Sequence, residues 1–265
     1  LKSSKFLQKK AIYSVLQPEN LNDSDFKEII LKQNIDLLIV VAYGKILPSW
    51  LLEHPKYGCL NVHFSILPKW RGAAPMQRAI ANGDKSLGVS FMKIEEKLDA
   101  GGIYKTFSTK NHGQDIYILE KKLVEMTNMH LSSTIVEICS EEIIPKTQEE
   151  EKVTYAHKVM KEEGLINWNI DSSQVFRNFL AFKRWPGSYF KFNNESVKAI
   201  DIENIKTITG IPGEIFSFDK NGMTVCCQKG AINLKSFQFP GKKVISSNDF
   251  FNSKRDIIPL KGNLI

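Results

Sequence analysis

The chain has 265 residues, of which 42% are hydrophobic and 25% charged, and its net charge at pH 7 is +7. This composition excludes an intrinsically disordered chain, which would contain fewer large aliphatic and aromatic residues. It also argues against a membrane protein, because the longest apolar run, residues 37–43, is far shorter than the roughly 18 residues that a membrane span needs. We expect a soluble globular protein with one large domain or two unequal ones.

Strands alternate with helices in the first 145 residues. Helical patterns cover residues 24–34, 48–52, 75–81 and 115–140, whereas apolar runs typical of strands cover residues 35–44, 59–65 and 87–94. This alternation predicts an α/β domain with a mostly parallel sheet over residues 1–145.

The pattern changes after residue 145. Residues 146–160 begin with a polar run and are interpreted as a linker. A helix over residues 171–182 is followed by short strands and tight turns, including an Asn-Gly hairpin turn at residues 219–222. We therefore predict a second domain over residues 161–265, a small β-barrel such as the oligonucleotide-binding fold. Its net charge of +5 fits a polyanionic partner, although a basic surface without such a partner explains the charge equally well.

The four cysteines show no spacing typical of a metal site. They are Cys59, Cys139, Cys226 and Cys227. We expect free thiols in a reducing compartment and no structural zinc.

Polar side chains follow two of the predicted strands. Asn61, His63 and Ser65 lie on one face of strand 59–65, and Asp99 precedes two glycines in the loop after strand 87–94. Ligands of open α/β sheets bind beyond the carboxyl ends of the strands. A lone buried histidine is more often a core residue than a catalyst, and an aspartate before two glycines usually belongs to a turn. The spacing therefore allows Asn61, His63 and Asp99 to form one site but does not require that they do.

A series of motifs runs through nearly the whole chain. They are Tyr-Gly at 43–44, Gly-Cys-Leu-Asn-Val-His at 58–63, Ser-Ile-Leu-Pro-Lys-Trp-Arg-Gly-Ala-Ala-Pro at 65–75, Leu-Asp-Ala-Gly at 98–101, Arg-Trp-Pro-Gly at 184–187 and Pro-Gly-Lys-Lys at 240–243. In this order they resemble the methionyl-tRNA formyltransferase family. The resemblance implies a Rossmann-like catalytic domain followed by an oligonucleotide-binding-fold domain that binds tRNA. It also implies transfer of a formyl group from 10-formyltetrahydrofolate to the amino group of methionyl initiator tRNA.

The resemblance assigns three catalytic residues by position: Asn61, His63 and Asp99. An amine that attacks a formyl carbon produces a negative oxygen, to which an asparagine amide and a histidine can donate hydrogen bonds. Asp99 would hold His63 or a water and take the proton that the amine loses. Neither a covalent enzyme intermediate nor a metal is expected.

The resemblance also suggests binding residues. For the folate they are Ser65, Ile66, Leu67 and Pro68, together with Val41, Ala42 and Tyr43. For the tRNA they are Arg71, Lys183, Arg184, Lys242 and Lys243. For Arg71 a role in substrate contact and a role in loop structure both remain open.

The family begins with a strand, a Gly-Thr-Pro turn, a helix and a long basic loop before the part that matches Lys2. We therefore expect a form that is truncated at its N-terminus and lacks the first strand of the sheet. Smaller departures from the family pattern are Lys93 and Lys97. We further expect a monomer in the bacterial cytoplasm or an organellar matrix, with no membrane attachment.

Three other functions deserve comparison. A formyltransferase for a small amine would share Asn61, His63 and Asp99 but would not need a basic second domain. A nucleic-acid-binding protein with an inactive α/β domain would fail to bind folate. A Ser-His-Asp hydrolase does not fit, because Ser65 lacks the Gly-x-Ser-x-Gly turn of such enzymes.

Overall fold

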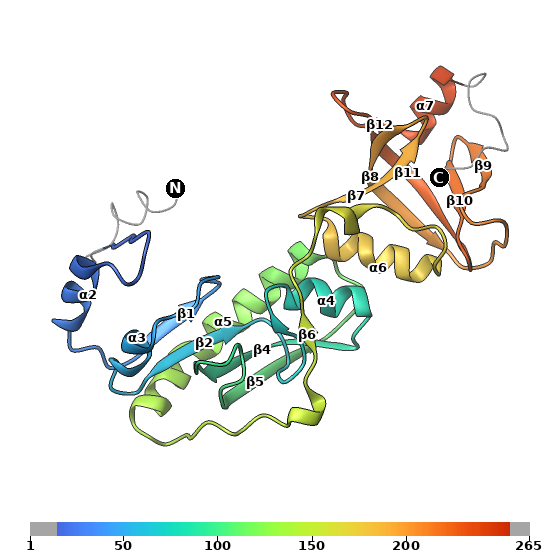
Figure 1. Cartoon of the computed structure of the whole chain (residues 1–265). Helices are drawn as coiled ribbons and strands as arrows, with labels where there is room; N and C mark the ends of the chain where they lie inside the picture. The colour runs from blue at the N-terminus through green and yellow to red at the C-terminus, as the bar shows by residue number, and fades with distance from the viewer. Residues whose placement is uncertain (1–14, 255–265) are drawn as a thin grey trace.

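The computed structural model describes residues 15–254, which form an N-terminal α/β domain and a C-terminal domain of antiparallel strands (Figure 1). The N-terminal domain contains helices α2 (Ser24–Leu31), α3 (Ser49–Glu53), α4 (Pro75–Asn82) and α5 (Ile116–Cys139), and strands β1 (Leu38–Val41), β2 (Cys59–His63), β3 (Arg71–Gly72), β4 (Ser86–Lys93) and β5 (Ile103–Lys110). Among residues 15–254, no helix combines the length and apolarity needed to cross a membrane.

The main sheet of the N-terminal domain has the strand order β1-β2-β4-β5. The α/β class is confirmed, but the expectation of a mostly parallel sheet needs correction for the described strands. Strands β1 and β2 are parallel, whereas β2 and β4, and β4 and β5, are antiparallel. The reason lies in the connection through α4, which returns the chain to the carboxyl end of β2, where His63 pairs with Ser90.

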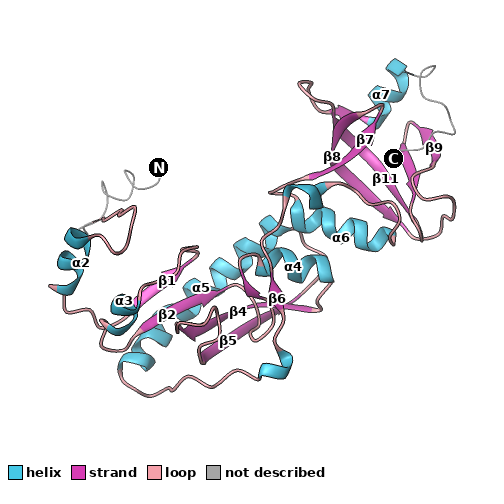
Figure 2. Cartoon of the chain, in the orientation of Figure 1, coloured by secondary structure: helices cyan, strands magenta, loops and turns pink. Residues whose placement is uncertain are grey.

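Helix α5 lies along the sheet (Figure 2) and supplies the centre of the N-terminal core. Leu119 and Leu123 of this helix are fully buried, and their cluster includes Ile80 of α4. The same cluster takes in Phe182 at the end of α6 (Ser172–Phe182). The first helix of the C-terminal domain therefore completes the core of the N-terminal domain.

The segment expected to be a linker packs against the N-terminal domain. Its strand β6 (Tyr155–Ala156) pairs in parallel with β3, and Gln148 and Val159 are buried. Two short 3-10 helices, η1 (Glu150–Lys152) and η2 (Lys161–Gly164), flank β6. Backbone and side-chain contacts thus fix the path between the two domains.

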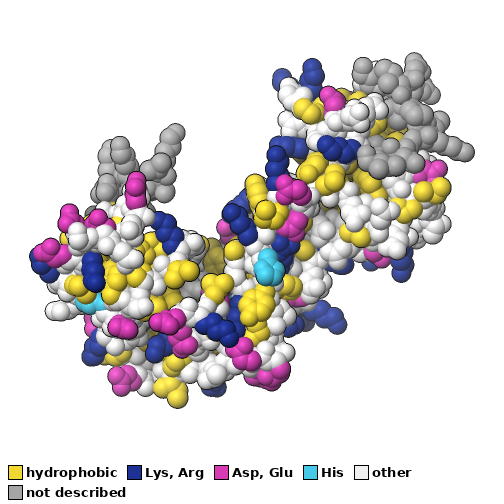
Figure 3. Space-filling view, in the orientation of Figure 1, with side chains coloured by type: hydrophobic (Ala, Val, Ile, Leu, Met, Phe, Trp, Pro, Cys, Tyr) yellow, Lys and Arg dark blue, Asp and Glu magenta, His cyan; other side chains and the backbone are white. Residues whose placement is uncertain are grey.

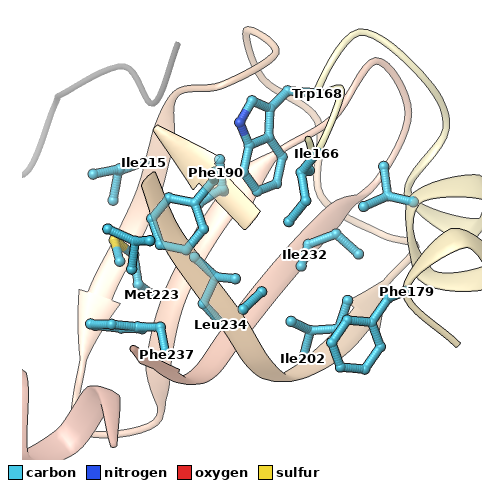
Figure 4. Close-up of a cluster of buried hydrophobic side chains, with 14 of the residues drawn as sticks. Ile166, Trp168, Phe179, Phe190, Ile202, Ile215, Met223, Ile232, Leu234 and Phe237 are labelled. Atoms are coloured by element: carbon cyan, nitrogen blue, oxygen red, sulfur yellow. The ribbon is translucent and has the colours of Figure 1, made fainter. Parts of the chain in front are cut away.

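The C-terminal domain is an antiparallel sheet in the order β7-β8-β11-β10-β9, with β12 on β11. Its strands are β7 (Ser188–Phe192), β8 (Glu195–Ile205), β9 (Ile215–Asp219), β10 (Gly222–Cys226), β11 (Ala231–Gln238) and β12 (Ile245–Ser246), followed by helix α7 (Ser247–Lys254). The predicted hairpin at residues 219–222 joins β9 to β10. Figure 4 shows the core of this domain, where Phe190, Phe237 and Trp168 are all buried.

Candidate active site

Strand β2 presents Asn61 and His63 at its carboxyl end. Alternation along the strand buries Leu60 and Val62 in an apolar cluster, which leaves Asn61 and His63 on the other face. His63 is 6% exposed and its Nε2 lies 2.9 Å from the carbonyl oxygen of Trp70. Because a carbonyl oxygen can only accept, this contact assigns the proton of neutral His63 to Nε2 and leaves Nδ1 as an acceptor.

Asp99 faces this histidine from the loop between β4 and β5. Its Oδ2 lies 3.8 Å from His63 Nδ1 and accepts a hydrogen bond of 2.8 Å from the backbone N–H of Gly72. The Asp99 side chain is 14% exposed, and its backbone adopts a left-handed conformation with φ of 47°. The structure thus brings His63 and Asp99 together, with Asn61 two residues earlier on the same face of β2.

The loop after β2 is held by internal hydrogen bonds. Ser65 Oγ donates to the carbonyl oxygen of Lys69 at 2.6 Å, and Ser90 Oγ donates to the carbonyl oxygen of Ser65 at 2.8 Å. Ser90 Oγ also accepts from the backbone N–H of Leu67. Since Ser65 and Leu67 are buried, the half-buried Ile66 and Pro68 are the members of the expected folate-binding turn whose side chains reach the surface.

The other residues expected to bind folate lie at the end of β1. Val41 pairs with Val62, so parallel pairing places the carboxyl end of β1 beside that of β2. Val41, Ala42 and Tyr43 are all exposed. They form an open surface next to the strand that carries His63.

Arg71 does not fit the expectation of a substrate contact. Its side chain is 0% exposed and donates from Nε to Gln148 Oε1 and from Nη2 to Glu150 Oε1, at 3.0 Å each. The structure therefore favours a role for Arg71 in the loop. Sequence reasoning missed Gln148, since a glutamine in a polar run carries no signal of burial.

Two of the residues expected to contact tRNA form ion pairs with acidic side chains of this chain. Lys183 Nζ lies 2.8 Å from Asp115 Oδ2, and Arg184 forms an ion pair with Glu120 of α5. The Arg184 guanidinium also lies 5.0 Å from the centre of the Tyr117 ring. These two cations hold α6 against the start of α5.

Lys242 and Lys243 are exposed in the loop between β11 and β12. In the space-filling view of Figure 3, Lys and Arg side chains are interspersed with Asp and Glu side chains over both domains. The positive charge of the C-terminal domain is therefore spread over its surface on this face.

A cavity of about 330 Å³ lies behind the loop, between α4, α5 and the start of β4. Ser65 and Ile66 of the expected folate-binding turn line it together with Phe64, Trp70 and Leu123, whereas Asn61, His63 and Asp99 do not. We therefore build the candidate site on the ends of β1 and β2 rather than on this cavity.

Two of the four cysteines lie in surroundings that keep the thiol protonated. Burial raises the pKa of the Cys59 thiol to about 11 and that of Cys227 to about 12, so both are protonated at neutral pH. All four cysteines are free. In residues 15–254, no group of three or more His, Cys, Asp or Glu side chains is arranged to hold a metal ion.

Comparison with known proteins identifies the family of the chain. Residues 2–135 match the model described as "Formyl transferase", and residues 158–255 match "Formyl transferase, C-terminal domain". The chain belongs to the formyltransferase family. The members of this family are transferase enzymes, and the chain is one of them.

A methionyl-tRNA formyltransferase from Buchnera aphidicola (subspecies Acyrthosiphon pisum) is 36% identical over 249 residues. This match covers 93% of the present chain and 79% of the relative. The resemblance found in the sequence motifs is thereby confirmed.

Solved structures share the fold at lower identity. HypX from Aquifex aeolicus, determined with tetrahydrofolic acid, has a TM-score of 0.64 and 15% identity, covering 88% of this chain and 42% of HypX. WlaRD, a sugar 3N-formyl transferase, has a TM-score of 0.62 and 18% identity, covering 91% and 82%. A methionyl-tRNA formyltransferase from Clostridium thermocellum has a TM-score of 0.57 and 18% identity, covering 76% and 86%.

Proposed function

We propose that this formyltransferase transfers the formyl group of 10-formyltetrahydrofolate to the amino group of methionyl initiator tRNA. The observation that carries the proposal is the position of Asp99 Oδ2, 3.8 Å from Nδ1 of His63 on strand β2, which also carries Asn61. The identity of 36% to a methionyl-tRNA formyltransferase supports the choice of substrate.

The three side chains fit direct attack by an amine. The methionine nitrogen adds to the formyl carbon, and the Asn61 amide donates a hydrogen bond to the oxygen that becomes negative. His63 takes the proton from the attacking nitrogen at Nδ1, while its Nε2–H stays on the carbonyl oxygen of Trp70. Asp99 stabilises the resulting imidazolium.

The second half of the reaction returns the proton. The bond between the formyl carbon and N10 of the folate breaks, and N10 receives the proton that His63 holds. The products are a formylated methionine and tetrahydrofolate, so atoms and charges balance without a covalent enzyme intermediate.

The folate would bind at the ends of the two parallel strands. Val41, Ala42 and Tyr43 offer an exposed surface beside β2. Ile66 and Pro68 contribute side chains from the adjoining loop, whereas the buried Ser65 and Leu67 keep that loop in shape through their hydrogen bonds to Lys69 and Ser90. These residues supply apolar contacts and backbone groups of the kind that hold a planar heterocycle.

The tRNA would add a contact with the C-terminal domain. Lys242 and Lys243 are exposed cations that can neutralise phosphates. Lys183 and Arg184, which are paired within the molecule, help this contact by fixing α6 on α5. With this substrate, the enzyme would work in the bacterial cytoplasm or an organellar matrix, where translation takes place. We further propose that it acts as a monomer.

The test is an assay of formyl transfer with the purified chain, 10-formyltetrahydrofolate and methionyl initiator tRNA. We expect formylmethionyl-tRNA, with much less product from methionyl elongator tRNA and none from free methionine. Formylation of an amino-sugar nucleotide in place of the tRNA would show a small-amine formyltransferase. Binding of tRNA without binding of folate would show a nucleic-acid-binding protein.

A further inference from the structure

We propose that Gln148 is a positioning residue, which sets the Asp99 carboxylate relative to His63 and which Arg71 holds in place. This inference rests on the formyl transfer proposed above, because it concerns the same site. Gln148 is 4% exposed although it lies in a polar segment whose neighbours Glu149 and Glu150 are exposed. A buried amide needs partners for its donors and its acceptor.

Both donors of the Gln148 amide go to the turn that carries Asp99. Its Nε2 donates to the carbonyl oxygen of Asp99 and to that of Gly101, at 2.8 Å each. Asp99 has the left-handed φ of 47°, which non-glycine residues adopt when the surroundings fix it. The two hydrogen bonds bracket the turn and hold it in this conformation.

Arg71 fixes the orientation of the amide. Its Nε donates to Gln148 Oε1, so a flipped amide would point its N–H groups at the guanidinium and its oxygen at two carbonyl oxygens. Arg71 is itself anchored by Glu150, through a contact of 3.0 Å. The buried cation therefore allows a single orientation of Gln148.

The backbone around Arg71 connects this support to the site. The residue before it, Trp70, accepts from His63 Nε2 through its carbonyl oxygen, and the residue after it, Gly72, donates its N–H to Asp99 Oδ2. His63 and the Asp99 carboxylate are thus held by three consecutive residues, and Gln148 holds the Asp99 backbone to the middle one. His63, residues 70–72, Gln148 and Asp99 thus form a closed ring of contacts.

The main test compares Gln148→Leu with Glu149→Gln in the full chain. Leucine has a similar volume but removes both donors and the acceptor, whereas Glu149 is an exposed neighbour outside the ring. We expect Gln148→Leu to lower kcat by ~10- to 100-fold, the scale of effect for a misplaced catalytic group, with the KM for tRNA unchanged. Glu149→Gln should match the wild type. A raised KM at an unchanged kcat would overturn the inference.

A double-mutant cycle separates positioning from a general loss of stability. If Gln148 acts through Asp99, then Gln148→Leu should change kcat by less than about threefold in an Asp99→Asn background, because the group that it positions is already lost. An equal loss in both backgrounds would contradict the proposal. If Gln148→Leu does not fold, Glu150→Ala serves the same cycle, since Glu150 is exposed and its loss loosens Arg71. A wild-type kcat for Glu150→Ala would then overturn the inference.

Amide hydrogen exchange gives a measurement that does not need activity. The Gly72 N–H, which Asp99 Oδ2 accepts, should exchange at least tenfold faster in Gln148→Leu than in the wild type and in Glu149→Gln. Unchanged exchange would reject the inference. Absence of formyl transfer by the wild type, in contrast, would reject the proposed function and leave this measurement to decide the role of Gln148.

Discussion

Replacement of Asp99 by Asn should leave the protein folded and remove most of its activity. The remaining side-chain oxygen can still accept from the Gly72 N–H, as Asp99 Oδ2 does at 2.8 Å. The new amide group, however, would donate toward His63 Nδ1 and occupy the atom that must take the proton. The substitution also removes the negative charge that faces the imidazolium.

The separation of the two groups gives the size of the effect. Opposite unit charges at the 3.8 Å between Asp99 Oδ2 and His63 Nδ1 interact by about 4 kcal/mol at an effective dielectric constant of about 20. A loss of about 4 kcal/mol from the transition state corresponds to roughly 10³ in rate. Because the Asp99 side chain retains some contact with solvent, we expect kcat to fall by ~10²- to 10³-fold.

The assay measures kcat for formyl transfer and the thermal unfolding of wild type and Asp99→Asn. Asp219→Asn is the matched control, since Asp219 also accepts a backbone hydrogen bond in a turn but lies in the distant β9–β10 hairpin. A kcat for Asp99→Asn within about threefold of the wild type, at equal stability, would show that Asp99 is a turn residue only and would refute the reasoning.

Three further predictions concern other parts of the molecule. Asn61→Ala should lower kcat by ~10²–10³, the usual effect of losing an oxyanion donor, and near-normal steady-state turnover would exclude that role. The hydrogen bond from Arg78 lowers the pKa of Glu163 below its ordinary 4.5. The contribution of this ion pair to the stability of the folded protein is therefore complete above pH 4.5, and it is lost as the pH falls through the lower pKa of the folded state. Calorimetry should therefore find Glu163→Gln less stable than the wild type at pH 7 but not in acid. Replacing Lys242 and Lys243 by Glu should weaken tRNA binding and reduce the slope of affinity against log salt by about one per lost phosphate contact, and an unchanged slope in filter binding would exclude the contact.

Elements with a strong local pattern were predictable from the sequence. The predicted helix over residues 115–140 corresponds to α5 at Ile116–Cys139, which Asp115 begins by accepting from the N–H groups of Tyr117 and Ile118. The predicted strand over residues 59–65 corresponds to β2, whose apolar residues are buried. A capping side chain and the apolar pattern of a helix or strand both involve residues that are close in the sequence, so such elements can be predicted from the sequence.

Strand β5 was missed for a physical reason. Its sequence carries Thr106, Ser108 and Lys110 at alternate positions, and all three are exposed at the edge of the described sheet. A half-polar strand that follows two glycines looks like a loop when the pairing strand is unknown. Its pairing with β4, from Ser86 opposite Lys110 to Met92 opposite Ile103, depends on the folded sheet and cannot be read from the local sequence.

The support of the candidate site was invisible for a related reason. Arg71 and Gln148 are polar and lie outside every helix and strand that the sequence predicts, so sequence patterns place both at the surface. Their burial depends on partners far along the chain, since the carbonyl oxygens that Gln148 contacts lie 47 and 49 residues away. Residue type suggested the catalytic side chains, but the contacts that position them follow from the fold alone.

The short ribbon of β3 and β6 has a consequence for the order of folding. It joins segments about 84 residues apart, as does the neighbouring hydrogen bond from the Trp70 N–H to Thr154 Oγ1. Contacts of such sequence separation close a long loop and form after local ones. During synthesis, the segments of the sheet and α5 are made before residues 146–160 and can begin to pack before β6 is available. The loop that carries Trp70, Arg71 and Gly72 acquires its final shape when β6 emerges, so the enzyme becomes competent late in its synthesis.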